Sequence, residues 1–472
     1  MGRRPAIGLF LGPLLFALIL LLPLPEGMGV EARAVAAVVV LMAIWWISEA
    51  LPMAVTALAP IVLFPLLGVM STAQTTASYA NHLIYLFLGG FLIAMAMQKW
   101  DLHRRIALLT IALVGSNPSR IILGFMLSTA FLSMWISNTA TAMMMLPIGL
   151  AVISSQQTEN ARESSHFAPA LMLSIAYSAS IGGVATLIGT PPNAILAGVL
   201  ENMSGTTIGF ADWLLFAFPL AVVMLALAWL YLTRIAYPMH GVATNQTRDL
   251  IHDQLRELGP LSRQEAMVLG VFLSVAIGWI LRGLLDIDWL KGVSDASIAM
   301  AGAIALFMLP SNWRKGEFLL DWQSAVKLPW EIIILFGGGF TLASGFADSG
   351  LTTWVVNQLG GLHDVPVWVL VLAVTLLVIF LTEVTSNTAT ATIVLPVMGA
   401  LAAAMEVAPT LLMIPAAIAA SFAFMLPVAT PPNAIVFSGG HLTVPQMARA
   451  GVWMNLIATV AVTILVLISS PL

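Results

Sequence analysis

The chain has 472 residues, of which 60% are hydrophobic and only 8% are charged. An ordinary soluble domain carries about 25% charged residues, so this composition excludes a soluble globular protein. It predicts an all-α protein that crosses a membrane many times. The net charge of −4 gives no reason to expect nucleic acid as a partner. Because cysteine is absent, disulfides, thiol catalysis and thiolate metal sites are excluded as well.

Apolar runs long enough to cross a bilayer core of about 30 Å predict eleven transmembrane helices. The first run is long and lacks a small-residue cleavage site, so we interpret it as a spanning helix and not as a signal peptide. The expected spans are 7–25, 34–52, 54–70, 82–112, 170–200, 213–233, 266–286, 296–311, 329–358, 408–440 and 446–470.

Two further apolar stretches, 119–155 and 365–405, contain the same six residues, Ser-Asn-Thr-Ala-Thr-Ala, at 137–142 and at 386–391. In the first stretch the arms on either side of the motif have sixteen and fifteen residues, which is short for a full crossing. We therefore expect two re-entrant helical hairpins with the motifs at their tips. The second hairpin has a longer first arm, and its assignment depends on the repeat.

The two halves of the chain match in register. The sequence LFLGGF at 86–91 corresponds to LFGGGF at 335–340, an offset of 249 that the two Ser-Asn-Thr motifs keep. A second motif, Thr-Pro-Pro-Asn-Ala-Ile, occurs at 190–195 and again at 430–435. Consecutive prolines remove two backbone donors, so each copy predicts a broken helix, within 170–200 and within 408–440.

The positions of the basic residues predict the topology. If the amino terminus is cytoplasmic and both hairpins return to their own side, all but three of the eighteen Lys and Arg residues lie in the cytoplasm. The three expected outside are Arg33, Arg282 and Lys291. The hairpins then enter from opposite sides, as in an inverted-topology repeat, and the carboxyl terminus lies outside. The expected organisation is an N-terminal helix at 1–33, a first repeat at 34–233, a cytoplasmic linker at 234–265 and a second repeat at 266–472.

Four helix breaks that meet inside a membrane predict a binding site for ions of both signs. Helix N-termini present free N–H groups to an anion such as a carboxylate, whereas helix C-termini and unwound carbonyls present oxygens to Na⁺. A single Ser-Asn-Thr motif in a membrane helix would more simply form hydrogen bonds between helices. Two copies in register, each paired with a broken helix, favour a site.

These motifs resemble those of the divalent anion/sodium symporter family, over nearly the whole chain. Residues 420–436, ASFAFMLPVATPPNAIV, fit the family's carboxyl-terminal signature, and WWISEALP at 45–52 resembles its early Trp-rich segment. The resemblance implies a multi-pass protein of the cell inner membrane, surrounded by membrane lipid. It further implies a homodimer in which a scaffold holds the interface and a transport part moves substrate as an elevator.

Carried over from the family, two sodium sites are implied, one in each repeat. The first comprises Ser133, Ser137 and Asn138 with the carbonyl of Gly189. The second comprises Thr382, Thr385 and Asn387 with the carbonyl of Ala429. Position 385 is often alanine in the family, so a role of Thr385 through its carbonyl alone is compatible with the resemblance.

The resemblance also implies a dicarboxylate between the two hairpin tips, one carboxylate at each. Both tip motifs end in threonine, a pattern more similar to the C4-dicarboxylate members than to the citrate carriers. The expected substrates are succinate, fumarate and malate. The expected substrate-binding residues are Ser137, Asn138, Thr139, Thr190, Pro191, Ser386, Asn387, Thr388, Thr430 and Pro431.

Several alternatives stay open from the sequence. A sodium-independent dicarboxylate exchanger shares the anion site, and citrate or sulfate are other possible substrates of a symporter. An enzyme would need convergent Asp, His or Cys in the membrane, and a channel would need a continuous polar path; neither pattern is present. Glu383, three residues before Ser386, is either a proton or cation-tuning group or a structural acid.

Overall fold

The structure is a computed structural model that describes residues 3–115, 117–156, 161–239, 245–285, 292–358 and 365–469. Within these ranges the regular secondary structure is helical apart from one short antiparallel pair of strands, β1 (Pro310–Asn312) and β2 (Glu317–Phe318). Ten of the described helical segments are long and apolar enough to cross a membrane. The predicted all-α, multi-pass architecture is confirmed at this level. Lys291, expected outside, is not among the described residues.

The first half of the chain forms helices up to α12. They are α1 (Arg3–Leu21), α2 (Val30–Ser48), α3 (Met53–Ala57), α4 (Ala59–Leu66), α5 (Thr72–Ala77), η1 (Ser78–Ala80), α6 (His82–Lys99), α7 (Leu102–Val114), α8 (Pro118–Ser133), α9 (Asn138–Gln156), α10 (Ala161–Val184), α11 (Pro191–Ser204) and α12 (Phe210–Leu230).

The second half begins with a π-helical continuation of α12. Its helices are η2 (Tyr231–Ala236), α13 (Asn245–Glu257), α14 (Arg263–Leu284), α15 (Asp295–Met308), η4 (Trp313–Lys315), α16 (Trp322–Ala325), α17 (Trp330–Asp348), α18 (Leu351–Gln358), α19 (Val367–Thr382), α20 (Asn387–Ala404), α21 (Thr410–Ser421), α22 (Pro431–Ser438) and α23 (Val444–Ile468).

The chain leaves helical geometry at each of the four motifs. The Ser-Asn-Thr motifs lie where α9 follows α8 and where α20 follows α19, and each asparagine is the first residue of the second helix. The two Thr-Pro-Pro-Asn motifs begin α11 and α22, with threonine as N-cap and proline in the first helical position. Proline suits that position because its missing N–H would have no helical partner there.

Three stretches expected as single spans are pairs of helices, so the prediction is wrong there. The stretch 329–358 contains α17 and α18, which are separated at Gly350, where φ is 76°. The stretch 54–70 contains α3 and α4, with Pro60 near the start of α4, where a proline interrupts the ladder of backbone hydrogen bonds. The stretch 82–112 contains α6 and α7. Between them Asp101 has a φ of 54°, a left-handed conformation that ends a right-handed helix.

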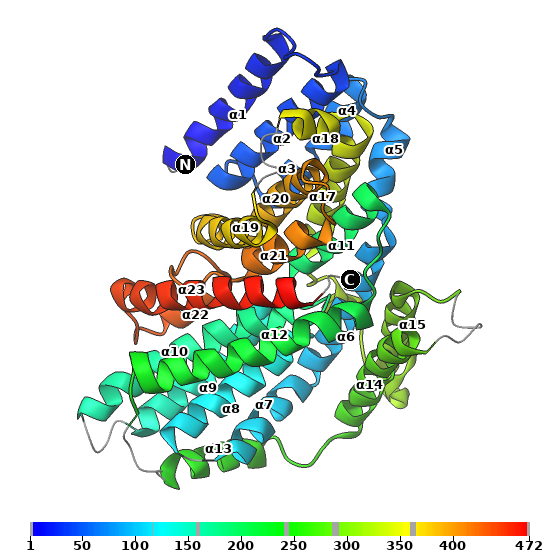
Figure 1. Ribbon diagram of the computed structural model, residues 1–472. Coiled ribbons are helices and arrows are strands. Elements are labelled where there is room, and N and C mark those ends of the chain that lie inside the picture. Colours follow the sequence, from blue (N-terminus) through cyan, green and yellow to red (C-terminus); the bar gives the residue numbers. More distant parts are fainter. Residues whose placement is uncertain are drawn as a thin grey trace.

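The two repeats interlock in space. Figure 1 shows α1, α2, α4 and α18 toward one end of the molecule, with α8, α9, α10 and α12 toward the other. Each helix that follows a Thr-Pro-Pro-Asn motif packs on a hairpin of the opposite repeat: α11 packs on α20, and α22 packs on α9. Tyr177 of α10 and Phe424, in the break before α22, meet edge to face at 4.9 Å between ring centres. The breaks of both repeats are thereby brought into one region.

The segment between α15 and α17, residues 309–329, makes a second set of contacts between the two halves of the chain. Lys99 at the end of α6 donates to Asp321 at 2.6 Å, and Trp100 Nε1 donates to the Leu319 carbonyl at 2.7 Å. The hydrogen bond from Lys99 lowers the pKa of Asp321 to about 2. Asp321 therefore stays ionised at any physiological pH.

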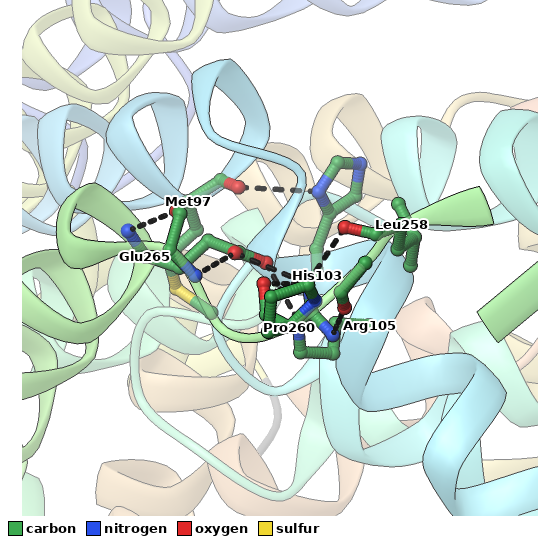
Figure 2. Close-up of polar contacts among 8 residues, drawn as sticks. Met97, His103, Arg105, Leu258, Pro260 and Glu265 are labelled. Atoms are coloured by element: carbon green, nitrogen blue, oxygen red, sulfur yellow. Dashed lines mark hydrogen bonds and ion pairs between the residues drawn. The ribbon is translucent and has the colours of Figure 1, made fainter. Parts of the chain in front are cut away.

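The end of the linker is held by a largely buried arginine, Arg105, shown in Figure 2. Arg105 of α7 donates to both carboxylate oxygens of Glu265, at 2.7 and 3.2 Å. It also donates to the carbonyls of Leu258, Gly259 and Pro260. Glu265 in turn completes a capping box at the start of α14. The linker thus has a fixed point of attachment to the first repeat.

Replacing Arg105 with glutamine is expected to lower stability by about 3–5 kcal/mol, because it leaves the Glu265 carboxylate buried without a counter-charge. The thermal unfolding midpoint of the detergent-solubilised protein measures this. Arg256→Gln is the matched control, since the Arg256–Asp253 pair is exposed and such pairs contribute little. Equal midpoints for Arg105→Gln and the wild type would contradict the role assigned to this contact.

Candidate functional site

Three oxygen atoms cluster at the tip of the first hairpin. Ser133, the last residue of α8, donates through Oγ to Oδ1 of Asn138 and to the carbonyl of Ala179 on α10, the latter at 2.8 Å. One hydroxyl proton is shared among these three oxygens, so the cluster has more lone pairs than donors. Neutral oxygens in this arrangement are what a hard cation such as Na⁺ requires.

The tip of the second hairpin has the same arrangement. Thr382 donates through Oγ1 to Oδ1 of Asn387 at 2.7 Å and to the carbonyl of Ala420 at 3.0 Å. The predicted ligand Thr385 uses its hydroxyl inside the hairpin, in contacts with Thr390 Oγ1 at 2.6 Å and the Leu381 carbonyl at 2.8 Å. Any contribution of Thr385 to a cation would therefore come from its carbonyl.

Close backbone approaches place the first break, the unwound segment 185–190 between α10 and α11, beside the first hairpin tip at 137–139. A Cβ atom on Gly183 would lie 2.6 Å from Oδ1 of Asn138, and one on Gly189 would lie 2.4 Å from the Gly183 carbonyl. Only glycine fits at both positions, so Asn138 and Gly189 are near neighbours through Gly183. In the second repeat, Ala429 is buried at the end of its break, and its closeness to Asn387 stays a prediction.

Two asparagines that sequence reasoning left out of the site hold the unwound segments. Asn193 is buried and donates through Nδ2 to three carbonyls of the first break, with the shortest bond, 2.8 Å, to Thr186. Asn433 donates to the carbonyls of Ala423 and Leu426, both at 3.0 Å. Unwound backbone inside a membrane needs such partners. The repeated Thr-Pro-Pro-Asn motif carried the signal that could have identified both residues.

The predicted substrate-binding residues lie at four helix N-termini. Half-buried at the starts of α9 and α20 are the hairpin-tip residues Ser137, Asn138, Thr139, Ser386, Asn387 and Thr388. Thr190 and Thr430 are the buried N-caps of α11 and α22, followed by Pro191 and Pro431. The starts of α9 and α20 present backbone N–H groups and the positive end of a helix dipole, which favours an anion. At the starts of α11 and α22 two consecutive prolines carry no N–H, so these helices contribute the dipole alone.

Comparison with known proteins identifies the family. The model of the sodium:sulfate symporter transmembrane region matches residues 6–470. The chain belongs to the divalent anion/sodium symporter family. The sodium-dependent dicarboxylate transporter SdcS of Staphylococcus saprophyticus is 45% identical over 98% of this chain and 91% of its own length. The sodium-dependent dicarboxylate transporter SdcS of Staphylococcus aureus (strain USA300) is 44% identical over 99% of this chain and 91% of its own length.

Two solved transporters are similar in fold to this symporter-family chain. YdaH of Alcanivorax borkumensis superposes with a TM-score of 0.58 at 12% identity, over 93% of this chain and 98% of that one. MtrF of Neisseria gonorrhoeae superposes with a TM-score of 0.57 at 13% identity, over 98% of this chain and 94% of that one. At such low identity the similarity concerns the fold alone.

In this family member, Glu383 forms hydrogen bonds to the second break, the unwound segment 422–430 between α21 and α22. Its buried carboxylate accepts hydrogen bonds from the backbone N–H groups of Phe424, Met425 and Leu426, at 2.7, 2.9 and 3.1 Å, and from Nδ2 of Asn455 on α23 at 2.8 Å. All four partners are donors, so the group they match is an ionised carboxylate, which is acceptor-only. Among the alternatives for Glu383, this geometry favours the structural acid. A structural acid at this position could have capped a helix of its own hairpin, but Glu383 instead binds the unwound segment at 424–426.

Proposed function

We propose that this protein is a secondary active transporter that couples the symport of C4-dicarboxylates to Na⁺. The observation that carries the proposal is the pair of equivalent oxygen clusters, Ser133–Asn138–Ala179 and Thr382–Asn387–Ala420. Within the described residues no group of three or more His, Cys, Asp or Glu side chains is placed to hold a metal ion. Neutral oxygen clusters of this kind suit Na⁺. The names of the SdcS relatives support both the cation and the substrate class.

In this proposal each sodium site combines its cluster with one unwound carbonyl, that of Gly189 or Ala429. The dicarboxylate then lies between the starts of α9 and α20, one carboxylate at each, where helix dipoles favour negative charge. Thr139 and Thr388 at these starts support succinate, fumarate and malate as substrates. An asparagine at each start serves cation and substrate together, which gives a physical reason for coupling their transport.

The membrane arrangement belongs to the same proposal. The helix pairs α8–α9 and α19–α20 are re-entrant hairpins that enter from opposite sides, whereas the long apolar helices outside these pairs cross the membrane fully. The amino terminus is cytoplasmic and the carboxyl terminus is outside, as the distribution of basic residues favours. A homodimer and an elevator movement of the part that contains both hairpins follow from the family resemblance.

Uptake of labelled succinate into proteoliposomes tests the proposal. With an inward Na⁺ gradient and no internal dicarboxylate we expect accumulation, and with an equal K⁺ gradient we expect none above protein-free vesicles. Uptake that ignores Na⁺ but requires internal dicarboxylate would make the protein an exchanger and overturn the coupling. Excess unlabelled fumarate and malate should compete with succinate more strongly than citrate or sulfate. The opposite order would overturn the C4 assignment.

A further inference from the structure

A groove on the outside of the helical bundle runs between α12–η2 and α23. The two segments are antiparallel neighbours: residues near the end of the first lie beside residues near the start of the second. Figure 1 shows α23 alongside α12 at the surface of the molecule. The α12–α23 groove consists of two adjoining cavities that share Trp453 and Ile457 in their walls.

The longer part of the groove is apolar throughout. A cavity of about 590 Å³ lies between one face of α12, at Pro219, Val223 and Leu227, and one face of α23, at Val460 and Ile464. The spacing of four residues on each helix makes one continuous stripe. No polar or charged side chain lines this part of the groove, so its chemistry suits a hydrocarbon chain.

The other part of the groove is a polar mouth. A second cavity, about 580 Å³, is lined by Tyr231 at the start of η2, by Tyr237 just after its end, and by Gln446 and Arg449 in the first turns of α23. Apolar side chains, among them Ile235 and Ala450, complete its wall. Arg449 is exposed, and in the part of the chain that the structure describes no carboxylate lies within ion-pair distance of it. A cation, an amide and two phenols thus surround one opening.

We propose that the α12–α23 groove binds an anionic phospholipid, with its phosphodiester at Arg449 and one acyl chain along the apolar stripe. Arginine and hydroxyl donors suit phosphate oxygens. From Trp453 to Ile464 the stripe is about 16 Å long at 1.5 Å per residue. That length matches one leaflet of a hydrocarbon core about 30 Å thick. The mouth lies at the end that the charge distribution assigns to the cytoplasm, where anionic lipids attract basic groups.

The groove is also connected to the broken helix of the second repeat. Two residues after Trp453, on the inner side of α23, the buried Asn455 donates to Glu383, which holds the unwound segment. A lipid that braces the outer face of α23 would therefore favour one position of the helix that carries Asn455. Binding itself can be tested without any assumption about the transported substrate.

Native mass spectrometry of the purified protein in detergent tests the proposal, with dioleoyl phosphatidylglycerol and dioleoyl phosphatidylcholine as probes. The two lipids have the same chains, so a difference reports the headgroup. We expect the anionic lipid to bind about fivefold more tightly, the ratio that one basic residue near a membrane surface provides. Arg449→Gln should remove this preference, whereas Arg263→Gln, which removes an exposed positive charge elsewhere, should keep it.

A second variant tests the chain-binding part independently. Val460→Trp fills the apolar stripe with a larger side chain and should weaken the binding of both lipids. Equal binding of the two lipids to the wild type, an unchanged preference in Arg449→Gln, or unchanged binding in Val460→Trp would each overturn the proposal. Lipid bound to monomers but absent from dimers would mean that a second copy of the chain covers the groove, and would overturn it too.

Discussion

Replacing Asn387 with alanine is expected to reduce sodium-driven dicarboxylate uptake by about 100-fold or more while leaving the protein folded. Oδ1 of Asn387 is one of three clustered oxygens, and the residue also begins α20, where we place one carboxylate of the substrate. A hydrogen bond or ligand contact to a charged group is worth about 1.5–3 kcal/mol, and this substitution removes such a contact from both the cation and the anion. Asn138→Ala should have the same effect through the first cluster.

Initial rates of succinate uptake in proteoliposomes, measured over a range of Na⁺ concentrations, test this expectation. Asn312→Ala is the control: Asn312 caps the short helix η4 in a loop, so its loss should leave the rate unchanged. Size-exclusion profiles and unfolding midpoints show whether each variant is folded. Full uptake by either hairpin variant would remove its oxygen cluster from the binding site.

The helix breaks could be predicted from sequence because their causes are local. Two consecutive prolines interrupt a helix wherever they occur, and the Ser-Asn-Thr copies lie at the same offset as the surrounding apolar pattern. The split between α6 and α7 could not be predicted in this way. It rests on the left-handed backbone of Asp101, a local conformation that an apolar pattern does not reveal. The charged residues beside it, Lys99, Arg104 and Arg105, were the signal in the sequence that could have indicated the interruption.

The candidate site was predictable as far as its members are close in sequence. Ser133 and Asn138 are five residues apart across one turn, as are Thr382 and Asn387, so each pair could be inferred from the motif and the family. The third oxygen of each cluster comes from a carbonyl of another helix. Which carbonyl approaches depends on close packing, and a carbonyl leaves no trace in residue identity.

Glu383 shows the same limit, since sequence alone left its role undecided between a functional group and a structural acid. Its partners lie about forty and seventy residues further along the chain, at 424–426 and 455. Only the folded arrangement shows that all of them are donors. The corresponding position of the first repeat, Met134, has no carboxylate. There the Met134 carbonyl accepts a hydrogen bond from Thr186, so the two repeats secure their breaks differently.

The loss of this carboxylate should impair transport strongly without changing its pH dependence. In Glu383→Gln an amide NH₂ replaces one carboxylate oxygen. At the Oε2 position it faces the N–H of Leu426, which is itself a donor, and at the Oε1 position it would face three donors. Each buried donor left without an acceptor costs about 1–3 kcal/mol, so the segment 424–426 loses its fixed position and uptake should fall about tenfold or more. The unfolding midpoint should fall as well.

The shape of the pH profile separates this structural role from proton transfer. A carboxylate that is ionised and held by four donors has no proton to exchange in the transport cycle. Initial uptake rates of Glu383→Gln, scaled to their maximum, should therefore follow the wild-type curve across the neutral range. Glu331→Gln, which neutralises an exposed acid in the first turn of α17, controls for the loss of one negative charge. A profile that shifts or flattens only in Glu383→Gln would mean that Glu383 carries a proton, and the structural role would be wrong.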